Sequence, residues 1–110
     1  MPRSVLIIDD EVDLCTVISS YLRRKDYTVD CAHSLADGLK KLDDVHPDVV
    51  LLDNNLPDGY GWVEAEKIHQ KYPSMRITLF SAADALPHSV APVFTKLQKP
   101  ISLSSIENYL

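Results

Sequence analysis

The stretch VVLLDNNLPDGYG, residues 49–61, runs from four consecutive apolar residues into an aspartate and then into a turn-like segment. An uninterrupted apolar run is typical of a strand that helices cover on both faces. Asp53 stands where this strand ends, and Pro57, Gly59 and Gly61 mark the turn after it. On its own, Asp53 would be an ordinary turn residue, so its role depends on the side chains that the fold brings beside it.

Strand-like and helix-like patterns alternate along the chain. The predicted strands are Val5 to Ile8, Thr28 to Ala32, Val49 to Leu52, Ile77 to Phe80 and Val93 to Leu97. Apolar residues with helical spacing follow four of these strands and predict four helices. After the first strand they are Leu14, Ile18 and Leu22, and after the second they are Leu35, Leu39 and Leu42, with Ser34 as the cap. After the third they are Trp62, Ala65, Ile68 and Tyr72, and after the last they are Leu103, Ile106 and Leu110, preceded by Ser102.

This alternation predicts an α/β fold, a doubly wound five-stranded parallel sheet in the flavodoxin-like order 2-1-3-4-5. The predicted fourth and fifth strands are separated by a segment that contains Pro87 and Pro92. Proline interrupts helices, so the fourth helix is expected to be short or irregular.

Composition limits the classes of function. The 110 residues suffice for one domain with one core. The net charge is -5 and the basic residues are dispersed apart from a run at 23–25, so direct contact with nucleic acid is not expected. No apolar run exceeds four residues, so we expect no membrane span, no signal peptide and a cytoplasmic location. Cys15 and Cys31 lack CxxC spacing and are predicted to be small core residues rather than a disulfide or a redox pair.

Polar side chains stand at the ends of four predicted strands. Asp9 and Asp10 follow the first, Asp53 ends the third, Ser81 ends the fourth and Lys99 follows the fifth. These strands are consecutive neighbours in the predicted order, and open α/β sheets bind ligands outside the carboxyl ends of their strands. The five residues are therefore expected to line one edge of the sheet.

A cluster of three carboxylates would be costly without a cation. Two like charges about 4 Å apart repel by roughly 4 kcal/mol at an effective dielectric of 20. The cluster would partly protonate unless a positive ion joined it. A hard divalent ion with oxygen ligands fits this need, and Mg²⁺ also bridges to phosphate.

Each of these residues also has a purely structural interpretation. Asp10 would N-cap the first helix, with Asp13 three residues on, and Asp53 would be a turn residue. Ser81 would cap the segment after it, and Lys99 would be solvated. The occurrence of these polar residues at the ends of four neighbouring strands favours one shared site over four unrelated surface features.

Four motifs in this order resemble the response-regulator receiver domain of two-component signalling, over essentially the whole chain. They are the acidic pair in IIDDE, the aspartate followed by NLPDGYG, the hydroxyl residue and alanine in FSA, and the Lys-Pro of QKP. The resemblance implies that the chain is a phosphorylation-dependent signalling switch, which takes part in its own phosphoryl transfer and hydrolysis but is not otherwise an enzyme.

The resemblance also implies roles for individual residues. Asp53 would accept a phosphoryl group from the phosphohistidine of a sensor histidine kinase or phosphotransfer protein. Asp9, Asp10 and Asp53 would hold Mg²⁺ together with the backbone carbonyl of Asn55. Ser81 and Lys99 would contact the phosphoryl oxygens. Family membership would further suggest a homodimer, and a longer regulator whose additional C-terminal domain binds DNA and controls transcription.

One position departs from the family pattern. Receiver domains usually carry an aromatic residue three positions before the lysine, where this chain has Lys96, and the nearest aromatic is Phe94. An alternative function is therefore a pseudo-receiver or scaffold, an interaction module that works without phosphorylation. An aspartate-nucleophile phosphatase is a third candidate, but such enzymes usually place a second aspartate where this chain has Asn55.

Overall fold

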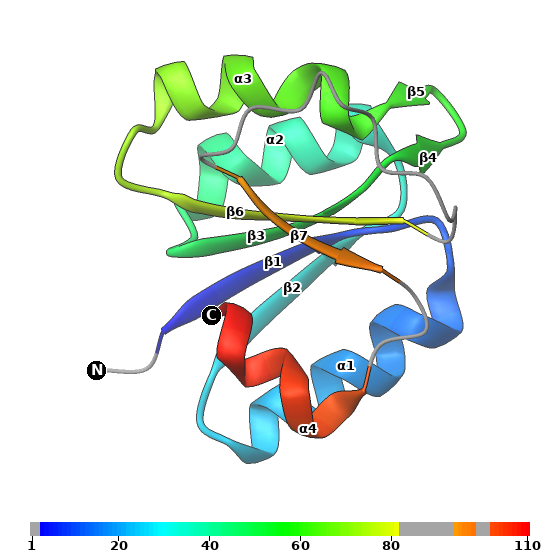
Figure 1. Cartoon of the computed structure of the whole chain (residues 1–110), viewed down its shortest axis with the longest axis vertical. Coiled ribbons are helices and arrows are strands. Elements are labelled where there is room, and N and C mark those ends of the chain that lie inside the picture. Colours follow the sequence, from blue (N-terminus) through cyan, green and yellow to red (C-terminus); the bar gives the residue numbers. More distant parts are fainter. Residues whose placement is uncertain (1–2, 82–93, 99–101) are drawn as a thin grey trace.

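The computed structural model describes residues 3–81, 94–98 and 102–110. Its main sheet has five parallel strands in the order β2-β1-β3-β6-β7, which confirms the predicted topology (Figure 1). The strands of this sheet are β1 (Ser4–Ile8), β2 (Thr28–Ala32), β3 (Val49–Asp53), β6 (Arg76–Ser81) and β7 (Thr95–Gln98). A separate antiparallel hairpin pairs β4 (Asn55–Leu56) with β5 (Gly59–Tyr60).

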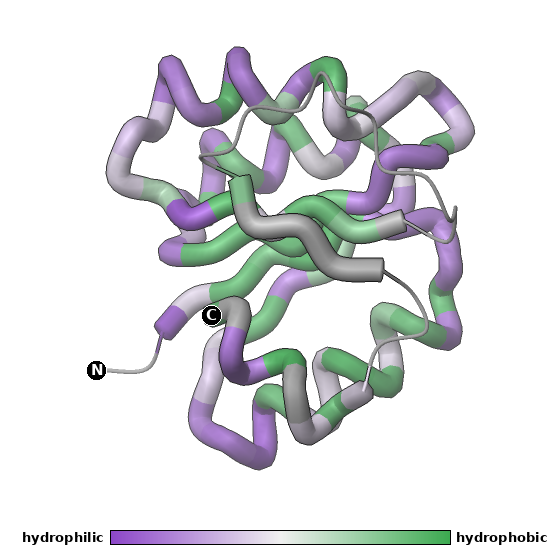
Figure 2. The backbone as a smooth tube through the Cα atoms, viewed as in Figure 1, coloured by the Kyte–Doolittle hydropathy of each residue, from purple (hydrophilic) through white to green (hydrophobic). Residues whose placement is uncertain are grey.

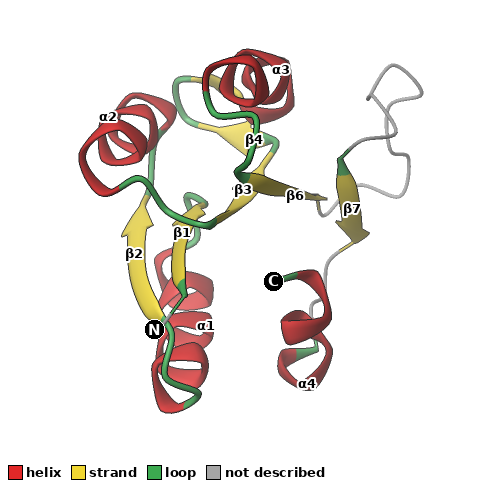
Figure 3. Ribbon diagram, turned by 90° about the vertical axis from the view of Figure 1, so that its left-hand side faces the viewer, coloured by secondary structure: helices red, strands yellow, loops and turns green. Residues whose placement is uncertain are grey.

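Helices cover both faces of the sheet. They are α1 (Val12–Arg24), α2 (Leu35–Val45), α3 (Gly61–Lys71) and the short α4 (Leu103–Ile106), which a 3-10 turn, Glu107–Tyr109, continues. Figures 1 and 3 show α2 and α3 on one face and α1 and α4 on the other. No helix in the described part of the chain combines the length and apolar character needed to cross a membrane.

The run VVLL serves both layers of the core. Val49 and Leu51 pack in a cluster with residues of α1, whereas Val50 and Leu52 pack in a cluster with residues of α2 and α3. Successive residues of a strand point to opposite faces, so all four positions must be apolar when both faces are covered. Figure 2 shows the result, with hydrophobic strands at the centre and hydrophilic residues on the outer helix surfaces.

Local signals set the helix ends much as predicted. The hydroxyl of Ser34 accepts a hydrogen bond from the backbone N–H of Asp37 at 3.2 Å, which confirms it as the N-cap of α2. His46 ends that helix in the left-handed conformation, with φ of 50°, directly before Pro47. The structural alternative for Asp10, an N-cap of α1, does not hold, because the N-cap residue is Glu11.

Some expectations need correction and others fall outside the described residues. The last strand was expected at Val93 to Leu97, but β7 begins at Thr95 and ends at Gln98. The β4–β5 hairpin was not predicted, because its strands have only two residues each. The expected fourth helix, Val93 and Lys99 lie outside the residues that the structure describes.

Asp58, in the turn of the hairpin, holds the start of α2. Its two carboxylate oxygens accept hydrogen bonds from the backbone N–H groups of Leu35, at 2.7 Å, and Ala36, at 2.9 Å. These are amide groups of the first turn, which have no partner within the helix. The bonds from Ala36 and Leu35 lower the pKa of Asp58. The aspartate of LPDGYG therefore links the end of β3 to α2.

We expect Asp58→Asn to lower the thermal unfolding midpoint at pH 7, because the amide carries no charge and has one acceptor oxygen. The folded-state pKa of Asp58 is lowered, so its stabilisation is present above the unfolded value of about 4 and is lost as the pH falls through the folded value. Circular dichroism melts should show the difference from wild type shrinking below pH 4.

Asp44→Asn provides the control. Asp44 is exposed in the last turn of α2, where a negative charge opposes the helix dipole. Its removal should leave the midpoint unchanged or raise it slightly. A difference between Asp58→Asn and wild type that is the same at pH 3 and pH 7 would contradict the role assigned to this carboxylate.

Candidate functional site

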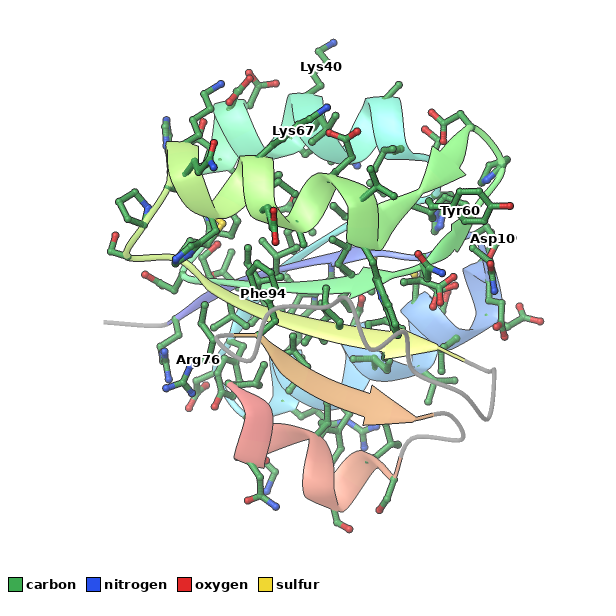
Figure 4. The ribbon with its side chains drawn as sticks, turned by 45° about the horizontal axis from the view of Figure 1, so that its top comes forward. Asp10, Lys40, Tyr60, Lys67, Arg76 and Phe94 are labelled. Carbon is green, nitrogen blue, oxygen red and sulfur yellow. The ribbon has the colours of Figure 1, made fainter. Side chains whose placement is uncertain are left out.

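The candidate site lies at the carboxyl end of the central strands. Strands β1 and β3 pair in parallel with Ile8 beside Leu52, so Asp9 and Asp53 are the next residues on neighbouring strands. Asp10 follows in the loop to α1. Figure 4 shows Asp10 at this end of the sheet with Tyr60 of the hairpin, whereas Arg76 lies at the opposite end.

Three carboxylates meet at this edge. Asp9, Asp10 and Asp53 each offer one carboxylate oxygen, and these oxygens all lie within 4.8 Å of one another. Asp9 is 0% exposed and Asp53 is 3% exposed, whereas Asp10 is an exposed residue. The cluster thus has two buried members and one that faces solvent.

Asp9 is held by bonds from several segments. Its backbone N–H donates to the carbonyl of Ala32 at 3.0 Å, and its Oδ1 accepts from the backbone N–H of Glu11 at 2.9 Å. Its own carbonyl accepts from the thiol of Cys15 at 3.6 Å and lies 2.9 Å from Nδ1 of His33. These contacts fix the backbone of Asp9, so the carboxylate cannot easily turn away from Asp53.

Gly61 packs against the backbone of the other buried aspartate, Asp53. A Cβ atom at Gly61 would lie 2.1 Å from the backbone oxygen of Asp53 and 3.0 Å from a methyl group of Leu52. The backbone N–H of Gly61 donates to the carbonyl of Asn54 at 2.9 Å, and the N–H of Trp62 donates to the Asn54 side-chain oxygen at 3.3 Å. The start of α3 therefore packs directly on the residue pair that ends β3, which only glycine permits.

Of the remaining predicted site residues, the structure describes Asn55 and the backbone of Ser81 but not Lys99. Asn55 is exposed and opens β4, where it pairs with Tyr60. The backbone of Ser81 ends β6, one residue beyond the Phe80 that pairs with Asp53. Ser81 pairs in turn with Gln98 of β7. Lys99 comes next in the chain but lies outside the described residues.

Electrostatics favours a cation at this cluster. Two unit charges 4.8 Å apart repel by about 3.5 kcal/mol at an effective dielectric of 20, and burial of Asp9 and Asp53 limits screening by water. The donor set consists only of carboxylate oxygens, the ligand type that hard divalent ions prefer. The residues present therefore fit a divalent metal.

The site contains supporting residues that the sequence interpretation missed. Gly61 was predicted only to mark a turn, and Asn54, Asp58 and His33 were given no individual role at the site. A glycine at the first position of a helix, directly after a predicted site loop, was the available signal for Gly61. Nothing local marked His33, which meets Asp9 only after the sheet has formed.

Comparison with known families decides the identity of the fold. The sequence profile of the response regulator receiver domain matches residues 5–110. The chain belongs to this family. Receiver domains are generally switch domains rather than enzymes, and they bind a divalent metal at an acidic pocket, which in this receiver domain corresponds to Asp9, Asp10 and Asp53.

Solved structures show the same fold. A CheY-like receiver domain protein from Methanospirillum hungatei JF-1 is 24% identical, with a TM-score of 0.89; the match covers 98% of this chain and 90% of that one. A CheY-like receiver domain from Methylobacillus flagellatus is 23% identical, with a TM-score of 0.86; the match covers 98% of this chain and 95% of that one. A response regulator from Burkholderia pseudomallei, solved with a phosphorylated aspartic acid, calcium ion and citrate, is 22% identical, with a TM-score of 0.85. The match covers 98% of this chain and 66% of that one.

Gly61→Ala should disturb the packing of α3 on β3, because the new methyl group meets backbone rather than a flexible side chain. We expect the free energy of unfolding to fall by about 1–3 kcal/mol, the range for overpacked sites. Urea denaturation measures this change. Glu66→Ala, at an exposed position of α3, is the matched control and should change stability by less than about 0.5 kcal/mol. Equal stabilities for Gly61→Ala and wild type would contradict the close packing of Gly61 against the backbone of Asp53.

Proposed function

We propose that this receiver domain is a phosphorylation-dependent switch in which Asp53 accepts a phosphoryl group from a partner's phosphohistidine. The observation that carries the proposal is the convergence of Asp9, Asp10 and Asp53, with their oxygens within 4.8 Å. The partner is a sensor histidine kinase or a phosphotransfer protein. Burial of Asp53 beside an exposed Asp10 supports a pocket that is entered from the solvent side of the cluster.

The transfer itself needs little proton chemistry. A carboxylate oxygen of Asp53 attacks phosphorus, an O–P bond forms, the N–P bond of the phosphohistidine breaks, and the imidazole leaves with its electron pair and takes up a proton. Such transfers depend mainly on positioning and charge stabilisation. Asp53 meets the first need, because β3 lies between β1 and β6 and Gly61 packs against its backbone.

Magnesium is the metal we propose for the acidic cluster. Asp9, Asp10 and Asp53 would hold it, together with the backbone carbonyl of Asn55, which lies two residues beyond Asp53. When bound, Mg²⁺ supplies positive charge that offsets the carboxylates and the incoming phosphoryl oxygens. Carboxylate oxygens suit this ion better than they suit softer transition metals.

Ser81 and Lys99 are proposed to bind the phosphoryl group. Strand register supports them, because Ser81 follows the residue that pairs with Asp53, and Lys99 follows the residue that pairs with Ser81. A hydroxyl can donate to a phosphoryl oxygen, and an ammonium group supplies a mobile point charge. Their contacts with phosphate would favour one of two conformations of the domain.

Transmission of the signal is proposed to differ from the usual receiver pattern. Lys96 lies within β7, where its backbone pairs with Leu79, at the position where the family usually has an aromatic residue. Phe94, just before β7, is 6% exposed and packs edge-on against His69 at 5.8 Å. This arrangement also supports the second candidate, a pseudo-receiver that acts as a constitutive interaction module.

The remaining partners are proposals of the same kind. A homodimer and an output domain that binds DNA and regulates transcription are consistent with the family. The net charge of -5 argues against direct nucleic-acid contact by this chain. Cytoplasmic location would place the domain where kinases of this type act.

Acetyl phosphate labelling distinguishes the two candidates. Incubation with acetyl phosphate and Mg²⁺ should add the mass of one phosphoryl group to the intact wild-type protein. Asp53→Asn should lose this addition completely, because the amide is not a nucleophile of comparable strength. Excess EDTA should suppress labelling of the wild type as well.

Asp44→Asn is the control for a change in acidic content, since Asp44 is exposed in the last turn of α2, whereas the hairpin after Asp53 contacts the first turn of that helix. It should label like the wild type. A folded wild-type protein that takes up no phosphoryl group under these conditions would favour the pseudo-receiver. Labelling that persists in Asp53→Asn would move the acceptor to another residue.

A further inference from the structure

A second group of reactive side chains lies between α1 and β2. A cavity of about 160 Å³ is lined by Cys15, Ser19 and Arg23 of α1, by Cys31 of β2 and by His33. Strand β2 is at the edge of the sheet, with α1 beneath it (Figure 3). Cys31 is half-buried, whereas Cys15 is 1% exposed. The expectation that both cysteines are plain core residues therefore holds only for Cys15.

The surroundings of Cys31 favour its thiolate. Its Sγ lies 3.0 Å from the Ser19 hydroxyl, which can donate a hydrogen bond to a thiolate. A hydrogen bond with the Cys15 side chain, the Ser19 hydroxyl and the nearby His33 and Arg23 together lower the pKa of Cys31 to about 6, against the opposing effect of burial. Thiolate character and access to solvent are the two properties that make a cysteine reactive.

We propose that Cys31 and Cys15 form a dithiol site that hydrogen peroxide converts into an intrachain disulfide between β2 and α1. The Sγ of Cys31 lies 3.9 Å from the backbone oxygen of Cys15, and both cysteines line the same cavity. This chemistry does not depend on phosphorylation of Asp53.

The oxidation balances in two steps. The Cys31 thiolate attacks one oxygen of peroxide, an S–O bond forms, the O–O bond breaks, and the released hydroxide takes up a proton to become water. The sulfur of Cys15 then attacks the sulfur of the Cys31 sulfenic acid. An S–S bond forms, the S–O bond breaks, and the leaving hydroxide takes the Cys15 proton. Two thiols are oxidised and one peroxide is reduced to two waters.

Burial sets the order of these steps. Peroxide reaches the half-buried Cys31 first, because Cys15 is only 1% exposed. The second step also removes the thiol hydrogen that Cys15 donates to the carbonyl of Asp9. The hydrogen bond from Cys15 to the backbone carbonyl of Asp9 thus connects the dithiol site to the acidic cluster.

Peptide mapping of the whole chain tests the proposal. Reduced protein is freed of reductant, treated with hydrogen peroxide, alkylated with iodoacetamide and digested with trypsin without reduction. Trypsin separates the cysteines into peptides 4–23 and 26–40. The expected result is an intact mass lower by two hydrogens and a linked peptide pair that dithiothreitol separates. Alkylation of both cysteines after peroxide treatment, or a link between two chains, would overturn it.

Variants identify the role of each group. Cys15→Ala, checked for folding by circular dichroism, should leave Cys31 as a sulfenic acid that dimedone traps. Arg23→Gln should slow alkylation of Cys31 in the reduced protein severalfold. Arg24→Gln is the matched control, because Arg24 bonds to the Ser20 carbonyl and does not line the cavity. Equal slowing in both arginine variants would contradict the contribution of the Arg23 charge, and absence of a dimedone adduct in a folded Cys15→Ala would contradict the first step.

Discussion

Crowding of negative charge at one edge of the sheet is the constraint on which the rest of the structure depends. Asp9 and Asp53 are buried and Asp10 is exposed, yet their oxygens lie within 4.8 Å of one another. Burying carboxylates is costly unless they are paired, hydrogen-bonded or bound to a metal. A fold that keeps such a cluster loses stability there, and the loss is recovered when a cation binds. In the function that we propose, phosphoryl acceptance by Asp53 depends on the same crowded carboxylates that fit a metal.

The surrounding elements are organised so that the carboxylates cannot avoid one another. Parallel pairing places Ile8 of β1 beside Leu52 of β3, and Asp9 and Asp53 directly follow this pair. The apolar run VVLL anchors β3 between two layers of helices. Gly61 lets α3 approach the backbone of Asp53, while Asp58 ties the following hairpin to α2. The site is therefore held by α2 and α3, the two helices on one face of the sheet.

Periodicity and strand ends were enough to predict the topology and the three acidic residues. An uninterrupted apolar run such as VVLL is typical of a strand that helices cover on both faces. Residues at the carboxyl ends of parallel strands lie at the same edge of the sheet. Contacts between segments distant in sequence could not be predicted, because no local pattern encodes them. Asp58 meets Leu35 across 23 positions, and His33 meets Asp9 across 24. The same reason hid the polar surroundings of Cys31, which depend on how α1 packs against β2. The assignments of Ser81 and Lys99 to phosphate binding stay predictions.

Unfolding of wild type and Asp10→Asn by urea, with and without Mg²⁺ at constant ionic strength, tests the central claim most directly. Without Mg²⁺, removal of one crowded charge should make the variant more stable than the wild type. With saturating Mg²⁺ the order should reverse, because a ligand that binds only the folded state stabilises it by RT ln(1 + [L]/Kd), and the wild type has the lower Kd. An order that is the same in both buffers, or stabilities that Mg²⁺ does not change, would contradict the claim that these carboxylates form a cation site.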